Sequence, residues 1–416
     1  MNELQPSLYH SSTRGENSLR ILHTDFHTGW GGQASRILML SSELVRRGHE
    51  VTIAAPPGEL SARARQAGAH LAGLKVEDGF AFRSPGHAAS FIKDGRRMER
   101  LLGRSEFDIV DVHGSQDTWV TASVRALTGR PSCLVMTRHN TKRVRTGFAN
   151  RFLYGRLVDH LIIVDESVRK GYEPFLADGT LSASRISVIP SAYRSDLFHP
   201  GVKGAGVRAE LKIPADAIAV GVAGRLVEDK GHTYLLKAVA AIQSRVPGLV
   251  LVFAGMGPNE SRLRAEAAEL GLAESVRFLG FRSDIPEVTA AFDIAVLPSV
   301  GCDASSASLK EAMALGLPVI ATDIGGARGI LTEGSAGVIV PPADPEALAA
   351  QLLRLIDDPG AARGMGERAR REVERRYSIA RLADQTLDAY QTALTRLGLR
   401  RKAGTAAGKV GQGRTA

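Results

Sequence analysis

The chain has 416 residues, of which 44% are hydrophobic and 23% are charged. A chain of this length exceeds what one ordinary hydrophobic core serves, so we expect two domains. It contains no run of 18 or more apolar residues, so no membrane-spanning helix is expected. The polar first 17 residues lack the apolar segment of a secretory signal, and we expect no such signal.

The formal net charge is +9, which favours polyanionic neighbours such as nucleic acid, an anionic membrane face or a phosphorylated glycolipid. Aromatic residues are only 5% of the chain, and no basic–aromatic repeats of the kind that stack on single-stranded nucleic acid occur. We therefore expect no nucleic-acid partner. Cys133 and Cys302 are the two cysteines, without metal-binding spacing. This indicates a cytoplasmic protein, with peripheral attachment to the inner face of the plasma membrane left open.

Strands and helices alternate through the first half of the chain. Expected strands are 20–25, 49–55, 107–112, 132–137, 160–164 and 186–189, and expected helices are 33–47, 60–67 and 90–102. This alternation predicts a mostly parallel sheet that helices cover on both faces. The glycine-rich segment 201–206 then predicts a linker between domains.

A second alternation follows the linker. Its expected strands are 218–223, 249–253, 276–279, 294–297, 318–322 and 337–340, and its expected helices are 233–243, 260–270, 284–292 and 308–315, followed by helices that start at Pro345, Ala361 and Ser378. The fold class predicted is α/β, with two doubly wound, Rossmann-like domains facing a cleft. We place the first domain at 19–195 and the second at 196–377, with disordered ends at 1–18 and 398–416.

A glycine pair follows the first strand. Gly31 and Gly32 stand immediately before the first helix, where bare backbone N–H groups can approach a phosphate. A plain tight turn explains the pair equally well. The pattern is not Gly-x-Gly-x-x-Gly, so an NAD-dependent oxidoreductase is disfavoured.

Two cations follow the first strand of the second domain. Arg225 and Lys230 lie five residues apart in the loop. Together they can neutralise a diphosphate, and fixed cations lower the barrier when a diphosphate leaves with growing charge. Spacing alone would leave them as two surface cations, but the carboxylates downstream favour a joint site.

Those carboxylates are Asp303 and Glu311, eight residues apart. Asp303 precedes a helix, where it can grip sugar hydroxyls or simply cap the helix. Glu311 lies within that helix and can accept hydrogen bonds from a ribose diol, or can face solvent. The amides around Ala307 and Ser308, at the start of the helix, are placed for a phosphate.

In the first domain, His113 follows a strand and can hydrogen-bond a sugar or orient an acceptor hydroxyl, although a purely structural histidine is a rival. His139 follows the next strand and is a second candidate. It opens a basic segment in which six Lys/Arg residues and no acidic residue occur between positions 138 and 156. Such a run is usually a solvated face. Interleaved apolar residues favour instead an acceptor or membrane surface, for which we select Arg138, His139, Lys142, Arg143 and Arg145.

Taken together, these motifs resemble those of the retaining glycosyltransferases of family 4, which have the GT-B fold. The matching segments include the Gly31-Gly32 loop, Gly-Arg-Leu at 224–226 with Lys-Gly at 230–231, Phe-Ala-Gly-Met-Gly at 253–257, Asp-Ile-Ala-Val-Leu-Pro-Ser at 293–299 and Glu-Ala-Met-Ala-Leu-Gly-Leu-Pro at 311–318. Each segment is weak evidence alone, whereas the set in this order, over about residues 19–397, is specific.

The resemblance implies transfer of a sugar from a nucleotide diphosphate sugar to a glycan or glycolipid, with retention of configuration. It implies that Arg225 and Lys230 hold the diphosphate, that Glu311 binds the ribose and that the Gly31-Gly32 amides contact the phosphate. It further implies a final helix, 378–397, that crosses back to the first domain. Members usually need no metal, and the chain has no Asp-x-Asp motif. We therefore expect no metal and no cofactor.

The chain departs from the family pattern at one point. The usual Glu-x7-Glu begins here with Asp303, which is one methylene shorter, so its reach to a donor sugar differs. Assembly of lipopolysaccharide or surface polysaccharide is our leading interpretation. A sugar-nucleotide epimerase, hydrolase or phosphorylase of the same fold and a non-catalytic sugar-nucleotide-binding subunit are the alternatives.

Overall fold

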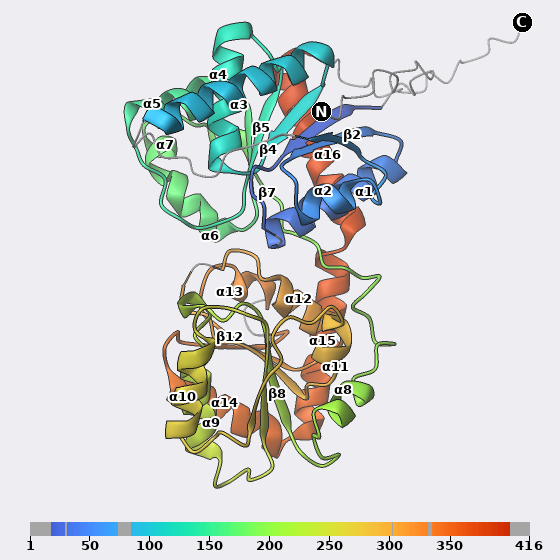
Figure 1. Cartoon of the computed structure of the whole chain (residues 1–416), viewed down its shortest axis with the longest axis vertical. Helices are drawn as coiled ribbons and strands as arrows, with labels where there is room; N and C mark the ends of the chain where they lie inside the picture. The colour runs from blue at the N-terminus through green and yellow to red at the C-terminus, as the bar shows by residue number, and fades with distance from the viewer. Residues whose placement is uncertain (1–17, 30, 74–84, 302, 332–334, 400–416) are drawn as a thin grey trace, which may run out of the picture.

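The computed structural model describes residues 18–29, 31–73, 85–301, 303–331 and 335–399. The segments predicted to be disordered, 1–18 and 398–416, fall almost wholly outside the described residues. Within the described part the chain forms two α/β domains, which Figure 1 shows one above the other. The predicted fold class is confirmed.

The first domain is built on a parallel sheet of seven strands in the order β3-β2-β1-β4-β5-β6-β7. The strands are β1 (Arg20–Thr24), β2 (Glu50–Ala55), β3 (His70–Gly73), β4 (Ile109–Val112), β5 (Leu134–Arg138), β6 (His160–Ile163) and β7 (Ile186–Val188). The helices are α1 (Gly32–Arg46), α2 (Glu59–Ala64), α3 (Pro85–Arg104), α4 (Ser115–Thr128), α5 (Phe148–Phe152), α6 (Glu166–Arg169) and α7 (Glu173–Ala177).

The second domain is built on a parallel sheet of six strands in the order β10-β9-β8-β11-β12-β13. The strands are β8 (Ala219–Ala223), β9 (Val250–Ala254), β10 (Val276–Phe278), β11 (Ile294–Leu297), β12 (Val319–Thr322) and β13 (Val338–Val340). The helices are α8 (Ala205–Glu210), α9 (His232–Ile242), α10 (Glu260–Glu269), α11 (Ile285–Ala290), α12 (Ala307–Ala314), α13 (Ala327–Ile330), α14 (Pro345–Asp357) and α15 (Pro359–Arg376). The last helix, α16 (Ile379–Arg396), packs on the first domain.

The last three helices begin at clear sequence signals. Side chains of Asp344, Asp358 and Ser378 each accept a hydrogen bond from a backbone N–H in the first turn of α14, α15 and α16. These residue types are the preferred helix N-caps, and proline follows two of them at the first helical position, where its missing N–H costs nothing. The predicted starts are therefore correct to within two residues.

Alternate residues along the central strands of the first domain face different helices, because successive side chains of a strand point to opposite faces. Leu22, Val110 and Met136 belong to one buried cluster. Ile21, Ile109 and Val135 belong to another, which also contains residues of α1 and α16. The face packed against α1 and α16 contributes to the candidate site. On this face, polar side chains follow the buried apolar residues toward the carboxyl ends of the strands.

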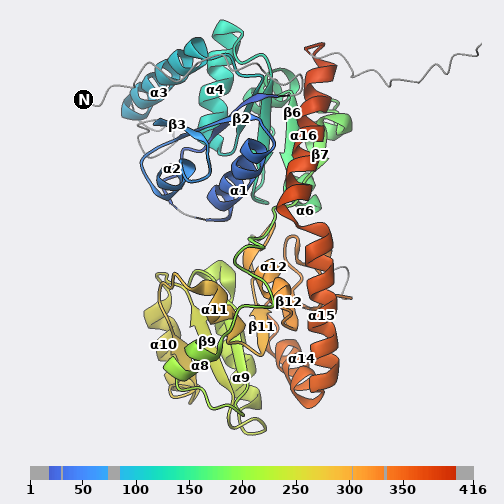
Figure 2. The same ribbon diagram turned by 90° about the vertical axis from the view of Figure 1, so that its right-hand side faces the viewer.

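The chain passes between the domains twice. The first passage is the segment after β7, and the second lies between α15 and α16. Figure 2 shows α16 leaving the second domain and lying along the first, where it packs on α1. The backbone N–H of Tyr193 donates to the carbonyl of Tyr377 over 3.2 Å, which holds the two passages side by side.

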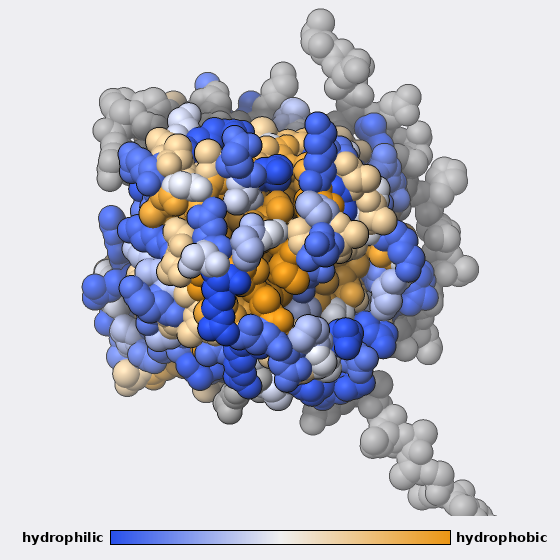
Figure 3. Space-filling model, turned by 90° about the horizontal axis from the view of Figure 1, so that it is seen from below, coloured by the Kyte–Doolittle hydropathy of each residue, from blue (hydrophilic) through white to orange (hydrophobic). Residues whose placement is uncertain are grey.

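Two surface findings complete the fold. No helix in the described ranges has both the length and the apolar character to cross a bilayer. The end of the molecule viewed in Figure 3 is mostly hydrophilic, with a hydrophobic area near its centre that hydrophilic side chains surround.

Candidate active site

The predicted cation and carboxylate sites of the second domain meet at the carboxyl edge of its sheet. β8 and β11 are neighbours, so the loops that follow them are adjacent. Lys230 Nζ donates to Asp303 Oδ2 over 2.5 Å, with 21% and 10% of the two side chains exposed. Arg225 is exposed, and its guanidinium makes no hydrogen bond or ion pair within the described residues. One predicted cation is therefore paired, and the other is available to an anion.

Backbone contacts fix these two loops against each other. The N–H groups of Val300 and Gly301 both donate to the carbonyl of Asp229. Gly231 has a φ of 66°, and a Cβ there would lie 2.0 Å from the Pro298 carbonyl oxygen. Only glycine fits such a left-handed position and such a close approach. The Lys-Gly motif thus places Lys230 beside the loop that carries Asp303.

The Gly-Gly pair at the end of the motif has a similar role. Gly325 has a φ of 58°, and a Cβ on it would lie 1.9 Å from the carbonyl oxygen of Asp303. The N–H of Gly326 donates to that same carbonyl oxygen over 3.2 Å. Close packing of the two glycines therefore fixes the backbone of the Asp303 loop.

Helix α12 begins at Ser306, not at Asp303. The Ser306 hydroxyl accepts from the N–H of Leu309, so Ser306 is the N-cap, and the alternative that Asp303 caps the helix is wrong. Asp303 instead holds Lys230. Ala307 and Ser308 are the first two residues of α12 and are half-buried. Their backbone N–H groups belong to the first turn, where the partial positive charge of a helix favours an anion.

Glu311 is half-buried one turn further along α12. Burial raises the pKa of its carboxyl to about 7, while the neighbouring charges of Lys310 and Arg194 act in the opposite direction. The alternative of a fully solvent-facing residue does not hold, because Glu311 is half-buried. A carboxyl group with a pKa near neutrality changes its hydrogen-bonding capacity over the physiological range.

Lys310 is a residue that our sequence reasoning missed. Its side chain is fully buried and reaches out of the second domain, donating from Nζ to the carbonyl of Ser191 over 2.7 Å and to Ser305 Oγ over 2.9 Å. Burial lowers the pKa of its ammonium group to about 7. From the other side, Arg36 of α1 donates to the carbonyl of Ile189 and to Ser191 Oγ. Buried cations of both domains thus converge on one segment, and the signal for Lys310 was its place inside an otherwise apolar helix face.

The Gly31-Gly32 pair lies at the start of α1, where Gly31 is the N-cap and has no side chain to satisfy the first N–H groups. Both glycines are exposed, and a Cβ on either would meet nothing within 4 Å. The backbone of Gly31 is extended, so neither residue is glycine for conformational reasons alone. Open space beside a helix N-terminus is what a phosphate contact requires.

The two predicted histidines are joined in the first domain. His113 Nδ1 lies 2.9 Å from His139 Nε2, and His113 Nε2 lies 3.0 Å from Nδ1 of a third ring, His23. His113 is buried, whereas His139 is half-buried. Burial lowers the pKa of His23 and of His113 to about 3 and holds that of His139 well below its usual range, so all three rings are neutral at pH 7.

The basic segment lines a pocket together with residues of α4. Lys142, Arg143 and Arg145 are exposed, and Arg138 is half-buried, with Nη2 bonded to the carbonyl of Lys142. A pocket of about 130 Å³ lies here, and its lining includes Arg138, Arg143, Arg145, Trp119 and Tyr154. Phe148 of α5 is 85% exposed beside these cations. The structure therefore places three of the five predicted acceptor residues, Arg138, Arg143 and Arg145, around one small, cationic cavity, whereas His139 and Lys142 do not line it.

Known proteins share this architecture. The structure of a glycosyltransferase from Rickettsia africae superimposes with a TM-score of 0.79 at 20% identity, covering 91% of this chain and 99% of that one. Anabaena HepE in complex with UDP-glucose gives a TM-score of 0.76 at 19% identity, covering 90% and 100%. At such identities these neighbours establish the fold alone, and the fold is GT-B.

The sequence comparisons establish the family. The description "Glycosyltransferase Family 4" matches residues 30–196, and "Glycosyl transferases group 1" matches residues 206–372. A D-inositol 3-phosphate glycosyltransferase of Corynebacterium glutamicum (strain R) is 32% identical over 281 residues, which are 63% of this chain and 67% of that protein. A phosphatidyl-myo-inositol mannosyltransferase of Mycolicibacterium smegmatis is 26% identical over 377 residues, or 87% and 90%. The chain belongs to the group 1, family 4 glycosyltransferases, as its motifs indicated.

Proposed function

We propose that this glycosyltransferase moves a sugar from a nucleotide diphosphate sugar to a glycan or glycolipid acceptor, with retention of configuration, in the assembly of lipopolysaccharide or another surface polysaccharide. The observation that carries the proposal is the arrangement at the carboxyl edge of the second sheet. There Arg225 has no side-chain partner among the residues that the structure describes, Lys230 adjoins Asp303, and α12 presents its first turn. The crevice outside the carboxyl ends of the strands is where open α/β sheets bind ligands.

The related proteins support the donor and the kind of acceptor. HepE was crystallised with UDP-glucose, which makes a nucleotide sugar the reasonable donor here. The names of two relatives, D-inositol 3-phosphate glycosyltransferase and phosphatidyl-myo-inositol mannosyltransferase, describe phosphorylated acceptors. An acceptor with a negative charge near the reacting hydroxyl fits the cationic pocket of the first domain.

The proposed chemistry needs fixed positive charge more than it needs a nucleophile. As the bond between the sugar C1 and the diphosphate oxygen breaks, charge grows on the leaving group, and Arg225 and Lys230 stabilise it. Front-side attack by the acceptor hydroxyl then forms the new bond on the same face, while the departing phosphate oxygen takes the hydroxyl proton. No metal enters this scheme. Detection of a covalent glycosyl-enzyme by intact mass would refute it in favour of double displacement.

The first-domain pocket suits the charged end of the acceptor rather than a sugar ring. Its volume of about 130 Å³ lies well below the usual 300–1,000 Å³ of a small-molecule site, so it admits a group of phosphate size. The exposed cations and Phe148 next to it suit the headgroup region of an anionic membrane. We propose that the protein attaches peripherally through this face when its acceptor is a lipid.

The test measures nucleotide release from a panel of UDP-, GDP- and ADP-sugars by the purified protein, with and without a membrane lipid extract and without added metal. Lys230→Ala is compared with Lys237→Ala, which removes an exposed lysine of α9 away from the site. We expect extract-dependent release from one donor that only Lys230→Ala abolishes. Release that needs no extract would indicate a hydrolase or epimerase. Absence of release and of calorimetric donor binding would overturn the proposal.

A further inference from the structure

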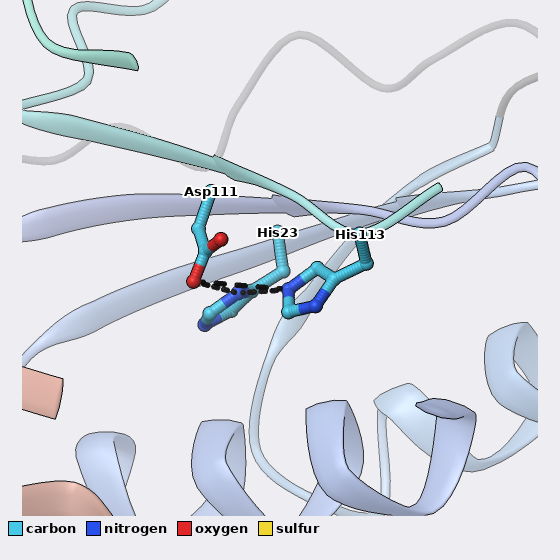
Figure 4. Close-up of side chains that lie close together, drawn as sticks. All are labelled: His23, Asp111 and His113. Atoms are coloured by element: carbon cyan, nitrogen blue, oxygen red, sulfur yellow. Dashed lines mark hydrogen bonds and ion pairs between the residues drawn. The ribbon is translucent and has the colours of Figure 1, made fainter. Parts of the chain in front are cut away.

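Three histidines and a carboxylate form one row across the middle of the first sheet, and all of them except the half-buried His139 are buried. His23 lies on β1, Asp111 on β4, His113 just after β4, and His139 just after β5. The strands β1, β4 and β5 are consecutive neighbours, and His23 is the direct register partner of Asp111. Figure 4 shows His23, Asp111 and His113 turned toward one another on the same face of the sheet.

The two N···N contacts constrain where the ring protons lie. Each contact, 3.0 Å between His23 and His113 and 2.9 Å between His113 and His139, is a hydrogen bond and holds one proton. Three neutral imidazoles carry three ring protons, because each has one N–H and one bare nitrogen. The third proton must therefore lie at an end of the row, on His23 Nε2 or on His139 Nδ1. The two ends are linked. If both shared protons move to the opposite nitrogen of their hydrogen bonds, the donor at one end of the row becomes an acceptor and the acceptor at the other end becomes a donor.

The inner end of the row is closed. His23 Nε2 is buried and has no hydrogen-bond partner within the described residues, and the same is true of Nε and Nη2 of Arg36. Asp111 lies 3.8 Å from the bonded nitrogens of both His23 and His113, so its charge favours neither ring. Tyr390 of α16 and Thr137 of β5 donate their hydroxyl protons to this carboxylate. The carboxylate is thus held in place from the crossing helix.

The outer end is open. His139 is the ring of the three that is not fully buried, and its Nδ1 makes no hydrogen bond inside the described part of the chain. The preceding residue, Arg138, lines the cationic pocket. Because successive side chains along a strand point to opposite faces, Arg138 faces the pocket and His139 faces the row. His139 thus lies one residue along the chain from the pocket where we position the charged end of the acceptor.

A metal ion is a weaker explanation for the same groups. The His23–His113 separation is that of a hydrogen bond, and both nitrogens already serve one another. The fully buried guanidinium of Arg36 lies close enough to lower the pKa of both His23 and His113, and it would also oppose a dication. The Asp111 carboxylate already accepts hydrogen bonds from two hydroxyl groups. It does not offset the charge of the Arg36 guanidinium and the charge of a dication together.

We propose that His139 contacts the hydroxyl of the acceptor, and that His113 and His23 are positioning residues, which hold its ring and set whether Nδ1 donates or accepts a hydrogen bond. This inference rests on the proposed transfer to an acceptor. From the sequence, His113 was the first candidate for the contact with the acceptor hydroxyl, and we now assign that contact to His139. His113 cannot serve directly without breaking a bond to another histidine.

The row itself is tested without substrate, by NMR of the full-length protein labelled with ¹⁵N-histidine. Ring nitrogens that carry a proton are distinguished from bare ones, and metal analysis of the same sample decides whether an ion is bound. We expect His139→Ala to shift the ring signals of both His113 and His23. The matched control is His160→Asn, since His160 is a buried histidine of β6 that bonds Ser187 and lies outside the row. An unchanged His23 signal, or a stoichiometric metal, would overturn the inference.

The contact with the acceptor is tested by separating transfer from donor binding. With the lipid extract and the donor that wild type uses, His139→Ala is expected to lower transfer about 10- to 100-fold, the effect of one hydrogen bond to a reacting group, and to leave the calorimetric Kd for the nucleotide unchanged. At His23, asparagine places an amide near the position of Nδ1, whereas phenylalanine places none. We therefore expect His23→Asn to keep most of the transfer rate and His23→Phe to lose it at similar thermal stability.

These outcomes distinguish failure of the role given to His139 from failure of the proposed function. An active wild type together with fully active His139→Ala overturns the role of His139 and leaves the proposed function standing. A wild type that consumes no nucleotide sugar overturns both. Equal loss in His23→Asn and His23→Phe, with lowered stability in each, would make the row a purely structural element.

Discussion

Asp303 and the diphosphate of a donor compete for the same ammonium group. Lys230 Nζ is bonded to Asp303 Oδ2 over 2.5 Å, so a diphosphate that binds Lys230 must share or displace this carboxylate. We predict that Asp303→Asn, which removes the charge and keeps the shape, tightens the binding of free nucleoside diphosphate. Lys230→Met should weaken it.

The magnitudes follow from the geometry of the pair. Two unit charges 4 Å apart interact by about 4 kcal/mol at an effective dielectric constant of about 20. Hydration of the exposed parts of both side chains and lost side-chain entropy offset most of this, which leaves about 1 kcal/mol, or roughly fivefold in Kd. A hydrogen bond to a charged group contributes about 1.5–3 kcal/mol, so Lys230→Met should weaken binding roughly 10- to 100-fold.

The assay is calorimetric titration with UDP, GDP and ADP of wild type, both single variants and the double variant Lys230→Met/Asp303→Asn. The double variant should bind as weakly as Lys230→Met alone, because the effect of Asp303 acts through Lys230. A loss of affinity in Asp303→Asn similar to that in Lys230→Met would refute the competition argument. It would show instead that the carboxylate holds Lys230 in the position that the diphosphate needs.

Three further predictions concern other parts of the molecule. Tyr390→Phe leaves the buried carboxylate of Asp111 with one donor fewer and should lower the free energy of unfolding by about 1–3 kcal/mol in urea denaturation; a loss below about 0.5 kcal/mol would contradict the role given to this bond. Because burial raises the pKa of Glu311 to about 7, its carboxylate fraction grows as pH rises through 7, so the donor KM should fall over that interval in wild type and stay flat in Glu311→Gln. A parallel pH dependence in the two proteins would rule out the ribose contact. Phe148 is 85% exposed beside Arg145, so replacing both by serine should reduce co-sedimentation with phosphatidylglycerol vesicles. Unchanged sedimentation, or equal binding of wild type to phosphatidylcholine vesicles, would exclude this face as the attachment surface.

The sequence predicted most of the fold because the main elements are long or strongly apolar. Strand β3 (His70–Gly73) and helix α4 (Ser115–Thr128) escaped prediction. The strand lies at the edge of the sheet, with four residues and no fully buried side chain, so it carries no alternating or continuous apolar signal. Other boundaries moved by a few residues, as at α3, which begins at Pro85 instead of 90. Such shifts depend on tertiary packing more than on local pattern.

The sequence predicted that the site lies at the carboxyl edge of the sheet, but it did not predict which side chains contact one another there. Lys230 and Asp303 are 73 residues apart, and only the adjacency of β8 and β11 brings them together. His23 could have been found from strand parity, because it follows the buried Ile21 by two positions and so shares its face. For Lys310, the apolar helix face indicated a buried lysine, but its partner could not be predicted. That partner depends on the path of the segment after β7, which no local pattern encodes.

The hydrogen bond between Tyr193 and Tyr377 joins the two places where the chain passes from one domain to the other. Two bodies connected by one strand can swivel in any direction, whereas two connections tied side by side behave as a single stiff joint. Arg36 and Lys310 hold the same joint from opposite sides through the backbone carbonyls of Ile189 and Ser191. We therefore expect relative motion of the domains to be bending at this joint, because twisting would break these bonds. In the proposed reaction, a donor bound to one domain would then approach the other domain along a single arc.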